Sequence, residues 1–520
     1  MSNRRMAPVR VGARQISHGV SSAAGRHARL PSGALGVVRS APVGNLLLRL
    51  RPDLSAARPA TFAQIVALLT LVALTFAGLL ASIVQPANLI ALVLVGPFLS
   101  VVLFRTAALS YALATGRRHR RRLREIPAER LPTYAVLVAL YDEAHVVPGL
   151  VESLAALDYP ASRLAIRFVV EECDAATQAA LAAEPLPPHM GVIVVPDGAP
   201  RTKPRALNYA LSRTRGSYVV VYDAEDQPEH DQLLRALAAF QRSSADTACQ
   251  QASLNIANHG ENWLSRQFAI EYSALFDLLL PTYRSLGLPM PLGGTSNHFR
   301  RSALEAVLAW DPHNVTEDAD LGVRLARFGM KVGVIPSTTW EEAPTTFPVW
   351  LRQRTRWLKG WMTTWLVHMR NPLRLVRDIG LWPFVGLQLM MTSMIVSALV
   401  HPWFYVFAAH EVWAGRGFDF ADPGGQSWVW WLAIVNLLGG YLTAMMLGAV
   451  AVLRRRRAAL LPAVLLLPLY WIAISLAAYR ALWQLVVAPH RWEKTPHAAR
   501  PARGIPVPAP AGNIARSDRR

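Results

Sequence analysis

Long apolar segments near both ends of the chain constrain its fold more than any other feature. Residues 62–84 and 87–104 are each long enough, and free enough of charge, to span a bilayer. Three further apolar blocks follow, at 381–409, 428–453 and 458–487. The stretch between the two groups has an ordinary globular composition. We therefore expect a membrane protein with about five spans, give or take one, around a single soluble domain.

Composition supports this division. Hydrophobic residues make up 52% of the chain and charged residues 17%, whereas a soluble chain carries about a quarter charged residues. These proportions exclude a disordered chain, a fibrous repeat and a purely soluble enzyme. The two cysteines, Cys173 and Cys249, match neither a zinc spacing nor a disulfide framework. We expect each to be a small buried residue in a reducing compartment.

The net charge of +20 does not indicate nucleic-acid binding. The basic residues cluster in an N-terminal arm (1–58), in the runs 117–122 and 454–457, and in a C-terminal tail (489–520). These clusters flank apolar segments, where retention on the cytoplasmic side and attraction to anionic lipid explain them. We expect the arm to be partly disordered.

The same charges predict a topology. Pro86 separates two apolar halves within 59–115, which we expect to form a transmembrane hairpin that returns the chain to its starting side. No cleavable signal is recognisable before it. The basic run after the hairpin marks that side as cytosolic, so we expect the soluble domain on the cytosolic face of a bacterial inner membrane. Three spans within 380–488 would then put the basic tail outside, unless Pro468 leaves one short element in the membrane interface.

Residues 130–345 alternate short β-branched runs with amphipathic stretches. Residues 134–140, 166–170, 192–195 and 218–222 predict strands, and 205–213 and 232–240 predict helices. This alternation indicates an α/β fold with a mostly parallel sheet, whose ligands bind at the carboxyl ends of the strands.

Acidic residues follow several of these predicted strands. A single such acid is better explained as a helix cap or a solvated loop, but a dense cluster of acids repels itself unless a cation neutralises it. All-oxygen ligands suit Mg²⁺ or Mn²⁺, which would hold a diphosphate here. The acidic groups are Asp142-Glu143, Glu171-Glu172, Asp223 with Glu225 and Asp226, and Glu317-Asp318.

The order of these acids and of three other motifs resembles the family 2 glycosyltransferases, in their membrane-embedded, cellulose-synthase-like branch. The other motifs are Thr-Lys-Pro-Arg-Ala-Leu-Asn at 202–208, Gly-Gly-Thr-Ser at 293–296 and Gln-Arg-Thr-Arg-Trp at 353–357. The resemblance covers residues 134–370. It implies a Rossmann-like GT-A fold and an inverting sugar transfer.

The resemblance also implies roles for individual residues. Asp318 takes the place of the general base, and Asp223, Glu225 and Asp226 stand at the metal motif, with Glu in place of its second Asp. The implied nucleotide-sugar ligands are Tyr141, Asp142, Glu143, Glu171, Glu172, Lys203, Asp223 and Glu225. The implied contacts to the acceptor and diphosphate are Gly294, Thr295, Glu317, Gln353, Arg356 and Trp357.

Residues 346–372 are rich in tryptophan and arginine. Their pattern predicts amphipathic helix in the membrane interface, with aromatic rings at headgroup depth. The Gln-Arg-Thr-Arg-Trp motif lies within this stretch. Both an interfacial and an acceptor-binding role are compatible with it.

We predict a metal-dependent hexosyltransferase that extends a β-linked polysaccharide from a nucleotide sugar, most simply a UDP-sugar, at the cytoplasmic face. Export through its own membrane domain and an envelope export partner are compatible with this prediction. Transfer of one sugar to a lipid acceptor is the alternative, and a non-catalytic nucleotide-sugar-binding transporter component is a third. The motif Trp492-Glu493-Lys494-Thr495-Pro496-His497 has no physical explanation from sequence alone.

Overall fold

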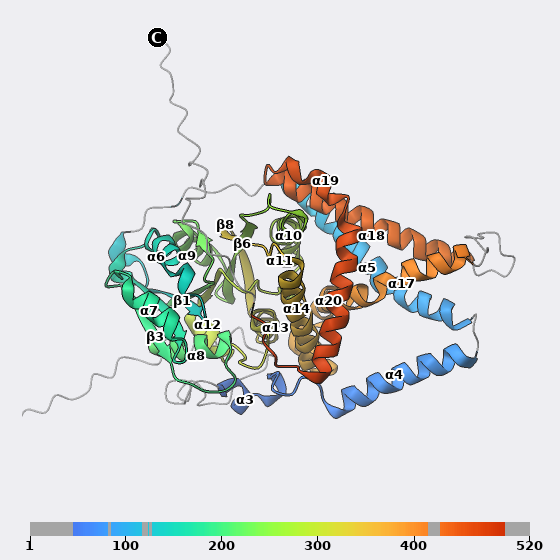
Figure 1. Cartoon of the computed structure of the whole chain (residues 1–520), viewed down its shortest axis with the longest axis horizontal. Helices are drawn as coiled ribbons and strands as arrows, with labels where there is room; N and C mark the ends of the chain where they lie inside the picture. The colour runs from blue at the N-terminus through green and yellow to red at the C-terminus, as the bar shows by residue number, and fades with distance from the viewer. Residues whose placement is uncertain (1–44, 82–84, 117–122, 124–126, 414–426, 495–520) are drawn as a thin grey trace, which may run out of the picture.

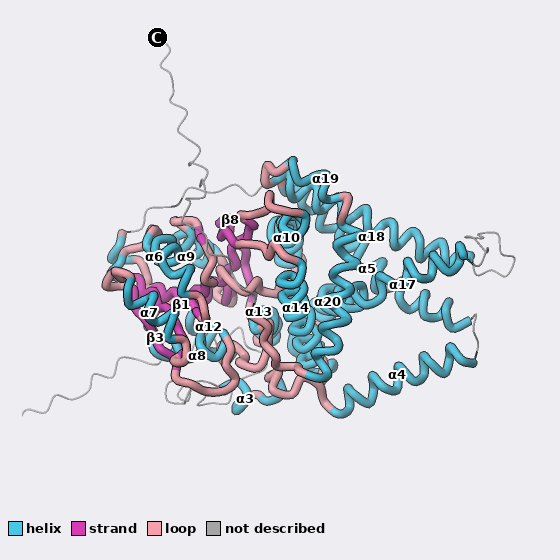
Figure 2. The backbone as a smooth tube through the Cα atoms, in the orientation of Figure 1, coloured by secondary structure: helices cyan, strands magenta, loops and turns pink. Residues whose placement is uncertain are grey.

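The computed structural model describes residues 45–81, 85–116, 123, 127–413 and 427–494 (Figure 1). The first 44 residues of the arm, the basic run 117–122, the loop 414–426 and the tail from 495 lie outside this description. Expectations for those segments stay predictions. Strands gather at one end of the molecule, and the other end consists of helices alone (Figure 2).

The central domain is built on an eight-stranded sheet of order β3-β2-β1-β4-β7-β6-β8-β5. The pairs among β1 to β4 are parallel, and β7 is antiparallel to both of its neighbours. This confirms the predicted α/β fold with a mostly parallel sheet. The strands are β1 Tyr134–Leu140, β2 Leu164–Glu171, β3 Met190–Val195, β4 Tyr218–Tyr222, β5 Gln227–Pro228, β6 Thr247–Ile256, β7 Asn297–Arg300 and β8 Lys331–Glu341.

Helices cover both faces of the sheet because successive side chains of a strand point to opposite faces. Val136 and Val138 of β1 pack with Leu237 on one face, whereas Ala135 and Leu137 pack under α8 and α13 on the other. The helices of the domain are α6 Val147–Ala155, α7 Ala175–Ala183, α8 Lys203–Arg213, α9 Gln232–Arg242, α12 Arg301–Ala306 and α13 Glu317–Arg327.

A second group of helices connects the domain to the membrane region. Phe268, Trp350, Met391 and Tyr470 share one buried cluster, so the two regions pack through a common apolar core. These helices are α10 Trp263–Ala274, the π-turn η6 Leu275–Leu279, α11 Leu280–Ser285, α14 Phe347–His368 and α15 Pro372–Ile379.

The end of the N-terminal arm docks on the central domain. It contains α3 Leu46–Leu50 and the 3₁₀ turn Pro52–Leu54, and its leucines pack against Leu308. The Ala56 amide donates to Asp311 Oδ2 at 2.5 Å, and Arg370 donates to backbone carbonyls on both sides of Ser55. The chain therefore enters the membrane region from the side of the central domain.

The membrane region contains apolar helices that match the predicted blocks. Within the described residues, four helical segments are long and apolar enough to cross a membrane: Phe98–Thr115, Leu381–Val406, Ile434–Arg454 and Leu467–Val487. The helices are α4 Phe62–Ala81, α5 Gln85–Thr115, α16 Leu381–Leu387, the π-turn η7 Gln388–Thr392, α17 Ser393–Trp413, α18 Ser427–Arg454, the 3₁₀ turn Ala458–Leu460, α19 Leu461–Val464 and α20 Leu467–Val487.

Helix α20 runs beside α14 and across the direction of α17 and α18 (Figure 1). Pro468 lies in its first turn. Both flanks of this segment contact the central domain: Arg455 pairs with Asp277 at 2.7 Å, and Lys494 donates to the Asp142 carbonyl at 2.6 Å. The segment from 455 to 494 thus begins and ends on the same side.

Candidate active site

One cavity of about 710 Å³ extends from the carboxyl edge of the sheet into the membrane helices. Its volume is in the range of small-molecule sites. Most of the residues predicted from sequence line it: Tyr141, Glu143, Glu171, Lys203, Asp223, Glu225, Gly294, Thr295, Glu317, Asp318, Gln353, Arg356 and Trp357. Segments more than 200 residues apart in sequence therefore form one site.

Three predicted residues do not line the cavity. Asp142 has a positive φ of 54° and offers its backbone carbonyl to Lys494. Glu172 is exposed and accepts a hydrogen bond from the Asp197 amide at 3.0 Å. Asp226 is fully buried behind the cavity wall.

The acids after β4 divide into two kinds. Asp223 and Glu225 line the cavity, whereas Asp226 turns inward and accepts hydrogen bonds from the Asp223 amide at 2.7 Å and from the Thr295 hydroxyl. Burial, with the nearby carboxylates of Asp223 and Glu225, raises the pKa of Asp226 well above its usual range. Asp226 thus shapes the turn that presents Asp223.

The described residues contain no group of three or more His, Cys, Asp or Glu side chains arranged to hold a metal ion. The structure therefore differs from the predicted triad, because Asp226 faces the core. Mg²⁺ is commonly held by one or two carboxylates together with substrate phosphates. Asp223 and Glu225 fit that arrangement, with a diphosphate supplying the other oxygens. Glu341, at the end of β8, adds a carboxylate whose pKa is raised by burial and by the three acids after β4.

Lys203 is the cation of the donor end. It is the first residue of α8, and its Nζ binds the Asp223 carboxylate and donates to the Gly294 carbonyl at 3.0 Å. Burial lowers the pKa of Lys203, but Asp223 and Glu317 raise it to a net value above the ordinary one. Arg205 instead pairs with Glu171 at 3.1 Å, so Arg205 neutralises a buried acid rather than facing the cavity.

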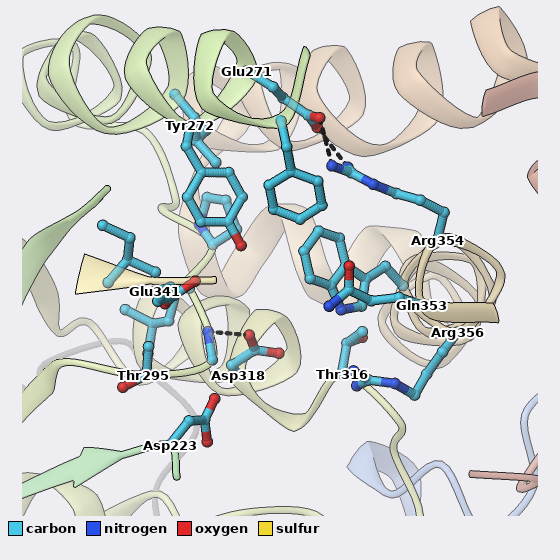
Figure 3. Close-up of a pocket in the computed structure, with 18 of the residues that line it drawn as sticks. Asp223, Glu271, Tyr272, Thr295, Thr316, Asp318, Glu341, Gln353, Arg354 and Arg356 are labelled. Carbon is cyan, nitrogen blue, oxygen red and sulfur yellow. Dashed lines mark hydrogen bonds and ion pairs between the residues drawn. The ribbon is translucent and has the colours of Figure 1, made fainter. Parts of the chain in front are cut away.

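Asp318 lies in the first turn of α13 and faces the same space as Asp223 (Figure 3). Its Oδ2 accepts a hydrogen bond from the Gly294 amide at 2.5 Å. Burial raises the pKa of the Asp318 carboxyl. Burial and the Asp318 carboxylate also raise the pKa of Glu317 to about 7. A carboxylate with a raised pKa is suited to accept a proton near neutral pH.

Helix α13 is held rigidly against α14. Asp320 pairs with Arg324 at 2.6 Å and contacts His368 of α14 at 3.0 Å, and all three side chains are buried. Gly360 of α14 lies so close to Thr316 that a Cβ at this position would clash with it. These contacts fix the distance between Asp318, in the first turn of α13, and the Gln-Arg-Thr-Arg-Trp motif of α14.

That motif places three side chains on the cavity wall. Gln353 Oε1 and Arg356 Nε are buried and have no hydrogen-bond partner among the described residues. Unsatisfied buried polar atoms at a cavity indicate a ligand that completes them. The Trp357 ring lies 4.7 Å from the Arg354 guanidinium, which pairs with Glu271 at 2.6 Å (Figure 3).

The motif at 492–497 has no explanation from sequence alone, and the structure describes its first three residues within the C-terminal segment 489–494. In the structure the Trp492 ring lies 4.7 Å from the Arg356 guanidinium, and Lys494 Nζ lies 3.7 Å from Glu143 Oε1. Glu493 pairs with Arg480 at 2.6 Å, which anchors the segment to α20. Trp492 and Lys494 both line the cavity. The segment therefore connects the α14 motif to the loop after β1, whereas Thr495, Pro496 and His497 lie outside the described residues.

Two further cavity residues were missed. Glu341 is the last residue of β8, so the rule that placed acids at strand ends would have found it had β8 been predicted. Glu271 lies on α10 and is recognisable only through its partner Arg354.

Residues 132–360 match the family model described as "Glycosyltransferase like family 2". A beta-monoglucosyldiacylglycerol synthase of Synechocystis sp. is 29% identical over 282 residues, which are 52% of this chain and 58% of that protein. A probable glucomannan 4-beta-mannosyltransferase 1 of Arabidopsis thaliana is 26% identical over 244 residues, 45% of this chain and 44% of that protein. The chain thus matches about half the length of these curated relatives.

Among solved structures, the chain is similar to the mannosyltransferase PcManGT from Pyrobaculum calidifontis in complex with GDP-Man and Mn²⁺. The sequence identity is 17% and the TM-score is 0.41, over 67% of this chain and 98% of that one.

Proposed function

Since residues 132–360, which contain the central sheet domain and most of α14, match the family 2 glycosyltransferases, we propose that the chain transfers a sugar from a nucleotide-sugar donor to an acceptor hydroxyl at the membrane surface. One observation carries the proposal. A single cavity contains Asp223, Lys203 and Asp318 at one end and side chains of the membrane helices at the other. A donor from the cytosol and an acceptor from the membrane would meet in it.

The reaction uses Asp318 as the general base. The acceptor oxygen forms a bond to the anomeric carbon of the donor as the bond from that carbon to the diphosphate oxygen breaks. The electron pair of the broken bond leaves with the nucleoside diphosphate, and the acceptor proton passes to the Asp318 carboxylate. Attack on the face opposite the leaving group inverts the anomeric centre. The Gly294 amide, which donates to Asp318 Oδ2, orients the carboxylate for this transfer.

Charge at the donor end stabilises the leaving group. Lys203, held against Asp223, is positioned to neutralise a diphosphate. Asp223 and Glu225 would hold Mg²⁺ or Mn²⁺, which when bound supplies further positive charge to the diphosphate. Tyr141 and Glu143, at the end of β1, lie farther along the same wall and are suited to the nucleoside. The comparison of nucleotide-sugar donors described below identifies the nucleoside that these two residues accept.

The acceptor enters from the membrane end. The sequence motifs predict a growing β-linked polysaccharide as the acceptor in preference to a lipid, but the lining of the cavity supports a lipid acceptor. Beyond Trp357 and Trp361, its walls are largely apolar: Leu279, Leu280, Met394, Ala444, Leu447 and Ile474. Such a surface binds hydrocarbon, whereas a sugar chain would leave its hydroxyls without partners there. We therefore propose transfer of a single sugar to a lipid hydroxyl.

The proposed topology has four crossing helices: α4, α5, the α16–α17 unit and α18. The contacts of Ala56 with Asp311, of Arg455 with Asp277 and of Lys494 with Asp142 keep all connecting segments against the central domain. An even number of crossings satisfies these contacts, with α20 lying along the membrane face beside α14. The basic runs put that face in the cytosol, which is compatible with a bacterial inner membrane.

The proposal is tested with the purified full-length chain in lipid nanodiscs that contain diacylglycerol. UDP-glucose, UDP-N-acetylglucosamine and GDP-mannose are supplied separately with Mg²⁺ or Mn²⁺, and nucleoside diphosphate release is measured. We expect release with one donor, dependent on the acceptor lipid. Absence of release with every donor and acceptor contradicts the proposed function.

A further inference from the structure

Arg105 places a positive charge deep in the membrane region. It lies in the middle of Phe98–Thr115, a segment of α5 that is long and apolar enough to cross a membrane. The residue also lines the cavity that contains Asp318. A charged side chain within the bilayer is costly, and where one occurs it commonly marks a ligand or transport site.

The surroundings of Arg105 do not neutralise it. Its Nη1 donates to the Gly440 carbonyl of α18 at 3.2 Å, and its guanidinium lies 5.2 Å from the Trp471 ring centroid of α20. Among the described residues, no Asp or Glu forms an ion pair with it. A guanidinium has five N–H donors, so the described contacts leave most of them for a ligand in the cavity.

Three helices hold this guanidinium in position. Gly440 of α18 faces Val102 of α5, and its backbone carbonyl is the atom that accepts the Arg105 hydrogen bond. Trp471 stacks on Tyr441 with ring centroids 5.4 Å apart, which fixes the indole on which Arg105 rests. The site is thus built from packed helices rather than from a mobile side chain at the surface.

Apolar side chains surround this charge. Leu279, Met394, Leu447 and Ile474 line the same part of the cavity. A fitting ligand therefore combines an anionic group with hydrocarbon chains. A guanidinium binds phosphate or carboxylate through paired N–H donors, and phosphate is the anionic group that a phospholipid headgroup carries.

We infer that Arg105 binds the phosphate of an acceptor phospholipid, with the acyl chains in the apolar part of the cavity and the headgroup hydroxyl directed towards Asp318. The inference rests on the proposed function and gives lipids whose headgroup carries both a phosphate and a free hydroxyl a preference over other lipid acceptors. Neutral diacylglycerol would bind as an acceptor without this contact.

The test compares two acceptors in micelles of a hydroxyl-free amine-oxide detergent. Transfer is measured as nucleoside diphosphate release with phosphatidylglycerol or with diacylglycerol, for the wild type, Arg105→Gln, Arg105→Lys and the control Arg284→Gln. Arg284 is exposed on α11 and does not line the cavity. Phosphatidylglycerol retained by each purified variant is measured separately by native mass spectrometry, which also reports whether the variant is folded.

We expect Arg105→Gln to raise the KM for phosphatidylglycerol by about tenfold to a hundredfold, and to reduce its retention, with little change for diacylglycerol. Arg105→Lys should recover much of the loss, and Arg284→Gln should behave as the wild type. An unchanged KM and retention in Arg105→Gln overturn the inference, as does an equal loss with both acceptors.

Inorganic phosphate distinguishes a lipid headgroup from a free anion. Competition by millimolar phosphate in the wild type, without a preference for phosphatidylglycerol, would assign the site to free phosphate and overturn the lipid assignment. The proposed function fails separately, if the wild type releases no nucleoside diphosphate with either acceptor.

Discussion

The donor end of the cavity and its membrane end are built from different parts of the chain. Tyr141, Glu171 and Asp223 each lie at or directly after the end of a parallel strand, so adjacent strands bring them together. The membrane end instead combines α5, α17, α18 and α20, whose cavity residues extend from Arg105 to Ile474. Under the proposed function, local motifs would specify donor chemistry, whereas acceptor choice would depend on long-range helix packing.

The largest effect is expected at the donor end. Asp223→Ala removes the carboxylate that holds Lys203 and would hold the metal, so turnover should fall to background and metal-dependent donor binding should be lost. Isothermal titration with the donor and Mg²⁺ or Mn²⁺ measures the binding. Asp231→Ala is the matched control, because Asp231 pairs with Arg235 outside the cavity. Full activity of Asp223→Ala would remove this acid from the mechanism.

Asp318→Asn separates chemistry from binding at the junction of the two ends. The substitution keeps the size of the side chain but removes the proton acceptor, so transfer should fall by about 10²–10⁴-fold. Donor affinity should survive, because the diphosphate is held at Asp223 and Lys203. Both quantities are measured on the same purified variant. Near wild-type transfer would exclude Asp318 as the base, and loss of donor binding would make its role structural.

The pH profile tests the same residue without a mutation. A general base works only when deprotonated, and burial raises the pKa of Asp318 while that of its neighbour Glu317 is raised to about 7. Transfer should therefore slow at acidic pH, beginning above the ordinary carboxyl pKa of about 4, by up to about tenfold per pH unit. Glu317→Gln removes a neighbouring negative charge and should move this limb to lower pH. A profile that stays flat down to about pH 4 would contradict the assignment.

A substitution at the membrane end of the cavity should change the affinity for the acceptor and leave the affinity for the donor unchanged. Trp357→Ala removes a ring that lines the cavity beside Phe268 and Arg354. We expect the KM for the acceptor to rise about tenfold, equivalent to about 1.4 kcal/mol, with donor affinity unchanged. Trp382→Ala, in an exposed tryptophan of α16, is the control. Equal loss of donor and acceptor affinity would indicate that Trp357 only supports the fold.

The smallest effect is expected at the C-terminal segment. Lys494 reaches the loop after β1 through partly exposed contacts of 3.7 Å and 3.8 Å to Glu143 and Asp142. Pairs of this kind contribute about 0.2–1 kcal/mol, so Lys494→Met should raise the donor KM only severalfold. Lys331→Met, at an exposed pair with Asp246, is the control. A larger change in the KM for the acceptor than in the KM for the donor would assign Lys494 to the membrane end of the cavity.

The donor half of the sheet was predictable from sequence. The predicted strands at 134–140 and 218–222 coincide with β1 and β4, because short continuous apolar runs between turn signals are typical of buried parallel strands. Strands β5 to β8 were not predicted. These strands combine parallel and antiparallel pairing. In addition, polar residues such as Gln250 and Gln251 of β6 are buried there through hydrogen bonds that no local sequence pattern reveals.

Two details of the site depend on tertiary structure. Three acids follow β4 within four residues, and only the turn geometry separates the inward Asp226 from Asp223 and Glu225. Helix α20 has the length and composition of a membrane span, yet its contacts with α14 and its flanks keep it beside the central domain. The amino-acid composition of a helix predicts that its surroundings are apolar, but it does not predict the direction in which the helix runs.

In the proposed reaction, a cytosolic donor and a membrane lipid meet in one cavity. The most direct test supplies radiolabelled donor to the full-length chain in phosphatidylglycerol nanodiscs and then separates lipid extract, ethanol-insoluble material and free sugar. We expect label in the lipid extract as a lipid bearing one sugar, lost in Asp318→Asn. Label confined to ethanol-insoluble polymer, with none in the lipid extract, would contradict it.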